Sequence, residues 1–179
     1  MSLGVPEGKL IMTEYDPAWK KYGQDMVEML KSVMKKAVDI QHVGSTAVEG
    51  MFAKPLIDIA VGVRSLDDVL EYVEELETMG IHYSGEIIEG QREFYRNDPE
   101  SGYKAYHIHC VIYDGPERMR SIALRDYLRA DTDAREAYIL LKKALLLRYK
   151  DRPDRYGKAK DVFMGDLADD AKKWRDGNV

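Results

Sequence analysis

The sequence has little cysteine and no long apolar run, and both absences exclude classes of protein. Its one cysteine, Cys110, lies in a predicted strand, so an internal disulfide and a cysteine-rich metal cluster are both excluded. No apolar run is long enough to cross a bilayer, and the first ten residues lack the basic and apolar regions of a secretory signal peptide. We therefore expect a reducing, cytoplasmic setting and no membrane partner.

An excess of basic charge is also missing. The 27 Lys and Arg residues are outnumbered by 32 Asp and Glu residues, and the formal net charge is -5. Such a chain has no general attraction to nucleic acid or to anionic membranes, so any anion site must be local. With 179 residues, 45% hydrophobic and 33% charged, the composition is that of one globular domain. We expect a core over roughly residues 15–115 and C-terminal helices over roughly 116–175.

The apolar periodicities predict a mixed sheet covered by helices. Strands are predicted at residues 38–43, 56–63, 81–88, 91–97 and 105–113. Helices are predicted at residues 17–37, 65–80, 117–129, 133–149 and 156–174. The last helix carries Val162, Leu167 and Trp174 as its apolar residues. This order of elements predicts an α+β fold with a helical C-terminal region.

A lone carboxylate, Asp58, stands in the otherwise apolar strand of the stretch HVGSTAVEGMFAKPLIDIAVGV, residues 42–63. An ionised carboxylate without partners is costly to remove from water. Strand alternation puts Leu56, Asp58, Ala60 and Gly62 on one face and the Ile and Val residues on the other, which we expect to be core. The small side chains beside the carboxylate leave space there. The pattern therefore predicts a pocket next to Asp58.

The turn before this strand has the features of a phosphate-binding site. Gly44, Ser45 and Thr46 lead into a short predicted helix, capped by Ser45 or Thr46, whose first N–H groups lie at the positive end of the helix dipole. Lys54 adds a positive charge. A carboxylate facing a phosphate repels it unless a divalent cation such as Mg2+ lies between them. A metal-bridged phosphate, with Asp58 holding the metal, is thus one interpretation.

The alternative interpretation is purely structural. Asp58 would then be a buried carboxylate bonded to loop N–H groups or paired with Lys54, and the Gly-Ser turn would be a simple capped turn. A Walker A loop is excluded in either case. Five residues rather than four separate Gly44 from Gly50, and Lys54 comes too late and precedes Pro55.

A second group of polar residues lies in AYHIHCVIY, residues 105–113. His107 and His109 are two apart on a strand, so they share a face with Cα atoms roughly 6–7 Å apart. That spacing suits one shared ligand or a metal, with His109 beside Asp58 as a candidate ligand, and His42 could join them. Two histidines do not by themselves make a metal site, so a structural or supporting role is the alternative. The opposite face, expected to be core, carries Tyr106, Ile108, Cys110 and Ile112.

Two further pairs of residues could contribute to a binding site. Arg92 and Arg96 alternate with Phe94 onto one strand face, where two guanidinium groups could hold a phosphate or carboxylate. The alternative is a solvated edge strand. Tyr156 and Lys160 are one helical turn apart and could reach the same site.

The chain resembles a known family. HVGSTAVEG, AKPLIDIAVGV, HIHCV, RDYLRADTDAREAYILLKKALL and YGKAKDVF are similar to segments of the GrpB family of uncharacterised bacterial and archaeal proteins, and the likeness runs from Tyr15 to Phe163. The resemblance implies a nucleotidyltransferase-like fold, in which a Gly-Ser turn holds nucleotide phosphates and acidic side chains on adjacent strands hold Mg2+. Gly44, Ser45 and Asp58 match that pattern.

The departures from that pattern bear on activity. The superfamily has a second carboxylate two residues after the first, where this sequence has Ala60, and a third on a later strand, where it has His107 and His109. One acid is too few for a two-metal phosphoryl-transfer mechanism. Glu49 stands where the family usually has proline, a loop change that we do not expect to alter chemistry.

Three functions follow from these residues and this resemblance. The first is a nucleotidyltransferase-like enzyme that binds a nucleoside triphosphate through the Gly-Ser turn and Lys54, with Asp58 holding Mg2+ and either histidine completing the site. The second is a non-catalytic module that binds a nucleotide or another small anion, which the missing acid at Ala60 favours. The third is a transition-metal hydrolase built on Asp58, His107 and His109.

Overall fold

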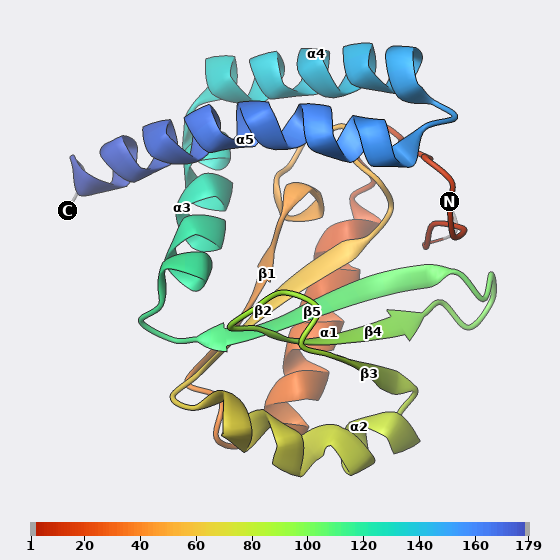
Figure 1. Ribbon diagram of the computed structural model, residues 1–179, viewed down its shortest axis with the longest axis vertical. Coiled ribbons are helices and arrows are strands. Elements are labelled where there is room, and N and C mark those ends of the chain that lie inside the picture. Colours follow the sequence, from red (N-terminus) through yellow and green to blue (C-terminus); the bar gives the residue numbers. More distant parts are fainter. Residues whose placement is uncertain (1–2, 178–179) are drawn as a thin grey trace.

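The structure is a computed structural model that describes residues 3–177. It contains a five-stranded sheet with helices on both faces (Figure 1). In sheet order the strands are β1 (Asp39–Val43), β2 (Ile57–Val63), β5 (Lys104–Ile112), β4 (Arg92–Asn97) and β3 (Ile81–Gly85). Only β2 and β5 pair in parallel; the other neighbours are antiparallel.

The helices follow the predicted order. The α-helices are α1 (Ala18–Val33), α2 (Val73–Thr78), α3 (Pro116–Ala130), α4 (Thr132–Tyr149) and α5 (Pro153–Asp176). The α+β prediction is therefore confirmed. The helix predicted over 65–80 is instead a 3-10 helix, η2 (Leu66–Tyr72), followed by α2. The last helix begins earlier than predicted, at Pro153, because proline fits the first turn of a helix.

One face of the sheet, which we call the core face, packs against α1 (Figure 1). The four Ile and Val side chains of β2 are fully buried there, as alternation predicts. On β5, Ile108 and Cys110 are buried in the same layer, but Ile112 is 38% exposed. The prediction for Ile112 is wrong because this residue ends the strand.

The C-terminal helices lie over the opposite face, which we call the cleft face, and α5 packs against α3 and α4 (Figure 1). Leu167 of α5 is buried and Trp174 contacts the ring of Tyr127, with centroids 6.0 Å apart. Val162 is 75% exposed, so its predicted packing role is wrong. Five residues turn a helix by about 500°, which leaves Val162 about 140° away from Leu167. No helix among residues 3–177 is both long and apolar enough to span a membrane.

A glycine on α1 makes room for a buried histidine on β1. A Cβ on Gly23 would lie 2.2 Å from His42 Nδ1. Burial lowers the pKa of His42 to about 4, so the ring is neutral at pH 7, and its Nε2 lies 3.0 Å from Thr46 Oγ1. Gly23→Ala is expected to destabilise the protein by about 1–3 kcal/mol through overpacking, in spite of the better helix propensity of alanine. Urea unfolding measures this.

The control for this prediction is a double-mutant cycle with His42→Ala. Removing the imidazole opens the space that the new methyl group needs, so Gly23→Ala should cost much less in the His42→Ala background. Equal costs in the two backgrounds would show that the glycine is not there to accommodate His42.

Candidate functional site

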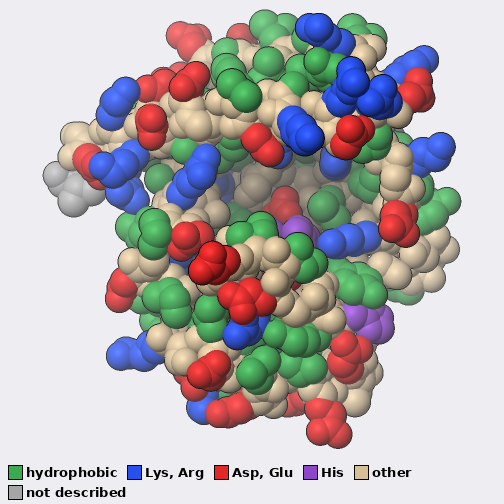
Figure 2. Space-filling model, in the orientation of Figure 1, with side chains coloured by type: hydrophobic (Ala, Val, Ile, Leu, Met, Phe, Trp, Pro, Cys, Tyr) green, Lys and Arg blue, Asp and Glu red, His purple; other side chains and the backbone are tan. Residues whose placement is uncertain are grey.

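A cleft lies between the cleft face of the sheet and the C-terminal helices. Figure 2 shows it as a hollow near the middle of the molecule, with acidic and histidine side chains at its floor. Its main cavity measures about 340 Å³, within the range of small-molecule sites. An adjoining cavity of about 220 Å³ shares four lining residues with it: Ser45, Asp58, Tyr138 and Lys160. The two cavities are therefore parts of one site.

The Gly-Ser turn and Asp58 meet at the floor of the cleft. Pairing of β1 with β2 puts Val43 opposite Asp58, so the turn that follows β1 closes over the carboxylate. Gly44 has φ 71°, and a Cβ there would lie 2.5 Å from Asp58 Oδ2. Only glycine fits both the backbone angle and the space. The structure thus brings together Gly44, Ser45 and Asp58, as the sequence indicated.

The turn is not the helix N-terminus that the sequence predicted. η1 (Ser45–Ala47) is a single 3-10 turn with no side-chain cap, and it ends before Gly50. So few aligned peptide groups give only a small dipole, so a helix dipole does not support phosphate binding at this turn. Thr46 is buried and donates to Leu56 O at 3.1 Å, away from the cleft. His42 lies beside α1 on the core face, so it does not join the histidine pair.

A buried lysine, Lys142 of α4, supplies the charge at the turn. Its Nζ donates to Ser45 Oγ at 2.6 Å and to Phe52 O at 3.0 Å, and it lies 4.2 Å from the centre of the Tyr138 ring. Burial, and next the charge of Lys160, lowers the pKa of Lys142 to about 7. Lys142 is not among the site residues predicted from the sequence. The sequence pattern that could have identified it is a lysine one helical turn after Tyr138, on the inward side of an apolar helix.

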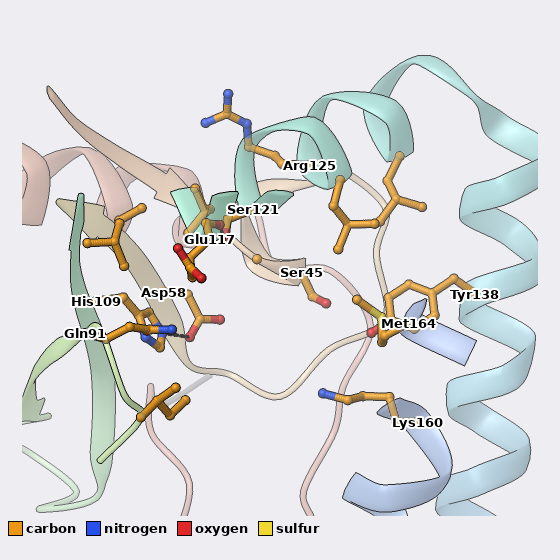
Figure 3. Close-up of a pocket in the computed structure, with 17 residues that line it drawn as sticks. Ser45, Asp58, Gln91, His109, Glu117, Ser121, Arg125, Tyr138, Lys160 and Met164 are labelled. Atoms are coloured by element: carbon orange, nitrogen blue, oxygen red, sulfur yellow. Dashed lines mark hydrogen bonds and ion pairs between the residues drawn. The ribbon is translucent and has the colours of Figure 1, made fainter. Parts of the chain in front are cut away.

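Two more lysines line the cleft beside it. Lys54 lies with Asp58 and Lys142 in the smaller cavity. Lys160 of α5 lines both cavities, and in the main one its side chain points in from the side of α5 (Figure 3). Burial, and then the charge of Lys160, lowers the pKa of Lys54. No ion pair joins Lys54 to Asp58 in the described structure, so the alternative pairing of these two is not formed. Three lysines face one carboxylate here, which favours an anionic ligand.

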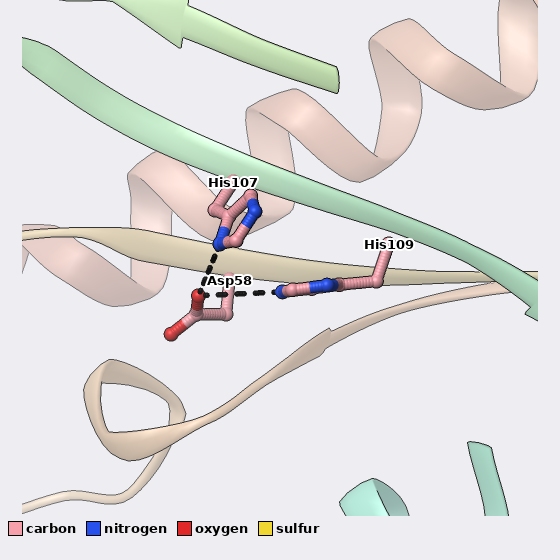
Figure 4. A group of neighbouring side chains, drawn as sticks. All are labelled: Asp58, His107 and His109. Carbon is pink, nitrogen blue, oxygen red and sulfur yellow. Dashed lines mark ion pairs between the residues drawn. The ribbon is translucent and has the colours of Figure 1, made fainter. Parts of the chain in front are cut away.

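Asp58 of β2 lies beside the two histidines of β5 and interacts with both (Figure 4). Asp58 Oδ1 is 3.8 Å from His107 Nδ1 and 3.8 Å from His109 Nε2. One ligand atom from each of the three residues lies within 4.8 Å of the others. The in-register pairing of β2 with β5 produces this arrangement, because Asp58 is the direct neighbour of His107. The predicted meeting of the carboxylate and the histidine pair is therefore present.

A buried glutamate lies behind the histidines. Glu93 of β4 is 3% exposed, and its Oε2 is 3.0 Å from His107 Nε2, while its Oε1 is 3.9 Å from His109 Nδ1. Burial, then the neighbouring His109, lowers the pKa of His107, and the bond to Glu93 opposes this. Glu93 is not among the site residues predicted from the sequence. Its signal was the alternation of β4, which turns Glu93 to the face opposite Phe94.

The two arginines of β4 are not part of this site. Phe94 is fully buried on the core face, and Arg92 and Arg96 share that side of the strand. Arg92 is paired with Glu86, and Arg96 Nη1 lies 3.6 Å from Met29 Sδ. The prediction that the two guanidinium groups together hold an anion is wrong, because one is paired with Glu86 and both lie on the core face, away from the cleft. The alternative, an edge strand, is also wrong, because β4 lies between β5 and β3.

The donor atoms in the cleft do not fit a pair of Mg2+ ions. Mg2+ prefers six oxygen ligands, and Asp58 is the single carboxylate of the cluster, with Ala60 two residues on. One Mg2+ that arrives with ligand phosphates does fit, because Asp58 and phosphate oxygens can share it. Glu117 of α3 adds a second carboxylate to the cavity wall, on the same side as Asp58 (Figure 3). Two imidazoles beside one carboxylate are instead a transition-metal donor set.

Comparison with known sequences gives a consistent family. Residues 9–170 match the family described as GrpB protein. The glutamate-rich protein GrpB of Alkalihalophilus pseudofirmus is 34% identical, over 92% of this chain and 97% of that protein. The UPF0157 protein YqkA of Bacillus subtilis is 31% identical over 96% of this chain, but the chain spans only 50% of that longer protein.

Comparison with solved structures identifies the fold. The crystal structure of GrpB from Enterococcus faecalis has a TM-score of 0.82 at 33% identity, and covers 92% of this chain and 99% of that one. The Cid1 poly(U) polymerase bound to MgGTP has a TM-score of 0.54 at 16% identity, over 75% of this chain and 44% of that one. At that identity the second likeness shows the nucleotidyltransferase-like fold alone.

Proposed function

Because the chain belongs to the GrpB family and has a nucleotidyltransferase-like fold, we propose that its cleft binds a nucleoside triphosphate with Mg2+ and transfers the nucleotidyl group to an acceptor. One observation carries the proposal. Ser45 and Lys142, which are hydrogen-bonded to each other, line the same cavity as the carboxylate of Asp58. A nucleoside triphosphate bound with a divalent cation presents both charges together.

The lysines support the anion-binding half of this proposal. Lys142 is fixed by Ser45 Oγ and Phe52 O, so it needs little reordering to meet a phosphate. Lys54 and Lys160 line the same cavity. With one carboxylate against three ammonium groups, the smaller cavity favours a ligand of several negative charges. A triphosphate meets that requirement better than a single carboxylate or phosphate does.

The transfer step assigns roles to residues of this chain. The acceptor oxygen would bond to the α-phosphorus as the bond to the bridging oxygen breaks, so pyrophosphate leaves. Lys142 and Ser45 would hold the leaving phosphates, and Glu117 would take the acceptor proton from the cavity wall. When bound, Mg2+ supplies charge neutralisation on the phosphates.

A second candidate function is nucleotide binding without turnover. Ala60 favours it, since a carboxylate is missing where a second metal ligand would stand. The two candidates share the cleft and the ligand class, and they differ only in whether pyrophosphate is released.

The test is thermal unfolding with ATP, GTP, CTP or UTP, each with and without Mg2+. A ligand at 100 times its Kd stabilises the folded state by about 2.7 kcal/mol. That corresponds to about 5–10 °C in Tm for a chain of this size. We expect such a rise for at least one triphosphate, larger with Mg2+. Inorganic phosphate at the same concentration is the control and should give a much smaller rise.

The outcomes separate the candidates. No rise with any triphosphate, in protein that is folded by circular dichroism, would contradict both. A rise accompanied by pyrophosphate release that Asp58→Asn abolishes supports transfer. A rise without pyrophosphate release supports binding alone.

A further inference from the structure

We propose that Asp58 Oδ1, His107 Nδ1 and His109 Nε2 form a three-ligand site for a transition-metal ion of the Zn2+ class, which binds without any nucleotide (Figure 4). The site needs only residues of the sheet, so it does not depend on the proposed nucleotide function. It also differs from the Mg2+ expectation, because two of its three donors are nitrogen.

The donor atoms of the three side chains favour a transition metal over Mg2+. Zn2+ and Co2+ accept imidazole nitrogen and carboxylate oxygen together, whereas Mg2+ keeps to oxygen ligands and water. Bonds of about 2.0–2.1 Å put neighbouring donors of a tetrahedral site about 3.3–3.4 Å apart. The two distances from Asp58 Oδ1 are 3.8 Å. A bound ion therefore has to shorten each of these two distances by about 0.4–0.5 Å. The two nitrogen donors lie within 4.8 Å of each other, so their separation has to shorten by at most about 1.5 Å.

Glu93 orients both imidazole rings. Each histidine turns one ring nitrogen toward Glu93 and the other toward Asp58 Oδ1. A neutral imidazole that donates an N–H to a carboxylate presents the lone pair of its other nitrogen. With Glu93 as acceptor, His107 presents the Nδ1 lone pair and His109 the Nε2 lone pair. Both lone pairs then face the same point as the carboxylate of Asp58.

An unpartnered buried atom points to the same arrangement. Glu93 Oε1 is buried and accepts no hydrogen bond, although His109 Nδ1 is only 3.9 Å away. A buried carboxylate oxygen without a donor is unfavourable. Fixing His109 Nε2 on a metal requires the proton to be on Nδ1, where a small ring movement lets it donate to that oxygen. Metal binding at His109 Nε2 and a hydrogen bond from His109 Nδ1 to Glu93 Oε1 thus favour each other.

The surroundings define the kind of site. Three protein ligands leave a fourth position open, as in catalytic rather than structural zinc sites. The Asp58 side chain is 29% exposed and lines the main cavity, so that position opens into the cleft. Water, or an oxygen of an anionic ligand, can complete the coordination there.

The experiment is a Co2+ titration of metal-free protein, with no nucleotide present and any histidine tag removed. We expect visible d–d absorption that saturates at one ion per chain, is displaced by one equivalent of Zn2+, and is unaffected by millimolar Mg2+. Asp58→Asn and His109→Ala should each weaken binding at least 100-fold. His82→Ala is the matched control. His82 of β3 is half-exposed and pairs with Glu77 of α2, and its loss should not change metal binding.

Glu93→Gln tests the positioning role. The isosteric change keeps the shape of the buried side chain, and we expect Co2+ binding to weaken 10–100-fold with an altered absorption spectrum. Circular dichroism of the metal-free variant shows whether it is folded. Binding that His82→Ala weakens as much as His109→Ala does, no saturable absorption, or displacement by Mg2+ would each overturn the proposal. If the protein binds Co2+ at this site but binds no triphosphate, the metal-site proposal is supported and the nucleotide function is contradicted.

Discussion

Lys142→Met is expected to make the protein more stable while weakening triphosphate binding by about 10–100-fold. Lys142 is 2% exposed, and burial holds its pKa at about 7. Relative to an unperturbed lysine with pKa 10.5, this costs the folded state roughly 4 kcal/mol at pH 7. Methionine removes that cost but also the donor to Phe52 O, a loss of about 1–3 kcal/mol. Urea unfolding at pH 7 should show a net gain of about 1–3 kcal/mol.

The pH dependence has a defined sign. Because the folded-state pKa lies below the unfolded value, the cost of Lys142 is fully present below pH 7 and disappears as the pH rises toward 10.5. The stability gain of Lys142→Met should follow the same course. Triphosphate binding by the wild type should weaken above pH 7, where Lys142 loses its proton.

The neighbouring lysine provides the control. Lys143 is the next residue of α4, but its side chain is 43% exposed and paired with Glu14 outside the cleft. Lys143→Met should change neither stability nor binding by much. If Lys142→Met bound triphosphates as tightly as Lys143→Met does, Lys142 would have no part in anion binding.

Asp58→Asn is expected to abolish the Mg2+-dependent part of triphosphate binding, a loss of at least 100-fold in the presence of Mg2+. The neutral amide is a far weaker ligand for a divalent cation than the carboxylate. Without Mg2+ the sign reverses: binding should be unchanged or tighter, because removing the carboxylate removes its repulsion of the phosphates. Calorimetric titration with and without Mg2+ measures both effects.

Asp114→Asn is the matched control, since it removes the same charge from an exposed turn outside the cavities. It should leave both titrations unchanged. Equal losses with and without Mg2+ in Asp58→Asn would mean that Asp58 has a structural role and does not hold a cation.

Local periodicity accounts for the part of the fold that the sequence predicted. An alternation of two residues identified the core face of β2, and it put His107 and His109 on one side of β5. Helical spacing located α3 to α5 but misassigned Val162, because a separation of five residues puts Val162 about 140° around the helix from the buried Leu167.

Tertiary packing accounts for what the sequence did not predict at the site. Glu93 meets the histidines through the register of β4 against β5, and Lys142 meets Ser45 through the docking of α4 over the turn. Neither contact has a local signature. Arg92 and Arg96 were misassigned for the same reason: a pattern groups residues on one strand face but does not say which face adjoins the cleft.

A crystal structure with Mn2+ and a non-hydrolysable triphosphate analogue, recorded with anomalous scattering at the manganese edge, shows whether one cleft binds a cation at Asp58 and phosphates at Ser45 and Lys142. We expect an anomalous peak about 2.2 Å from Asp58 Oδ1, with phosphate oxygens in hydrogen-bond contact with Lys142 Nζ. Analogue bound instead in the basic cavity lined by Lys20, Arg129 and Arg135, with no peak at Asp58, would contradict the account.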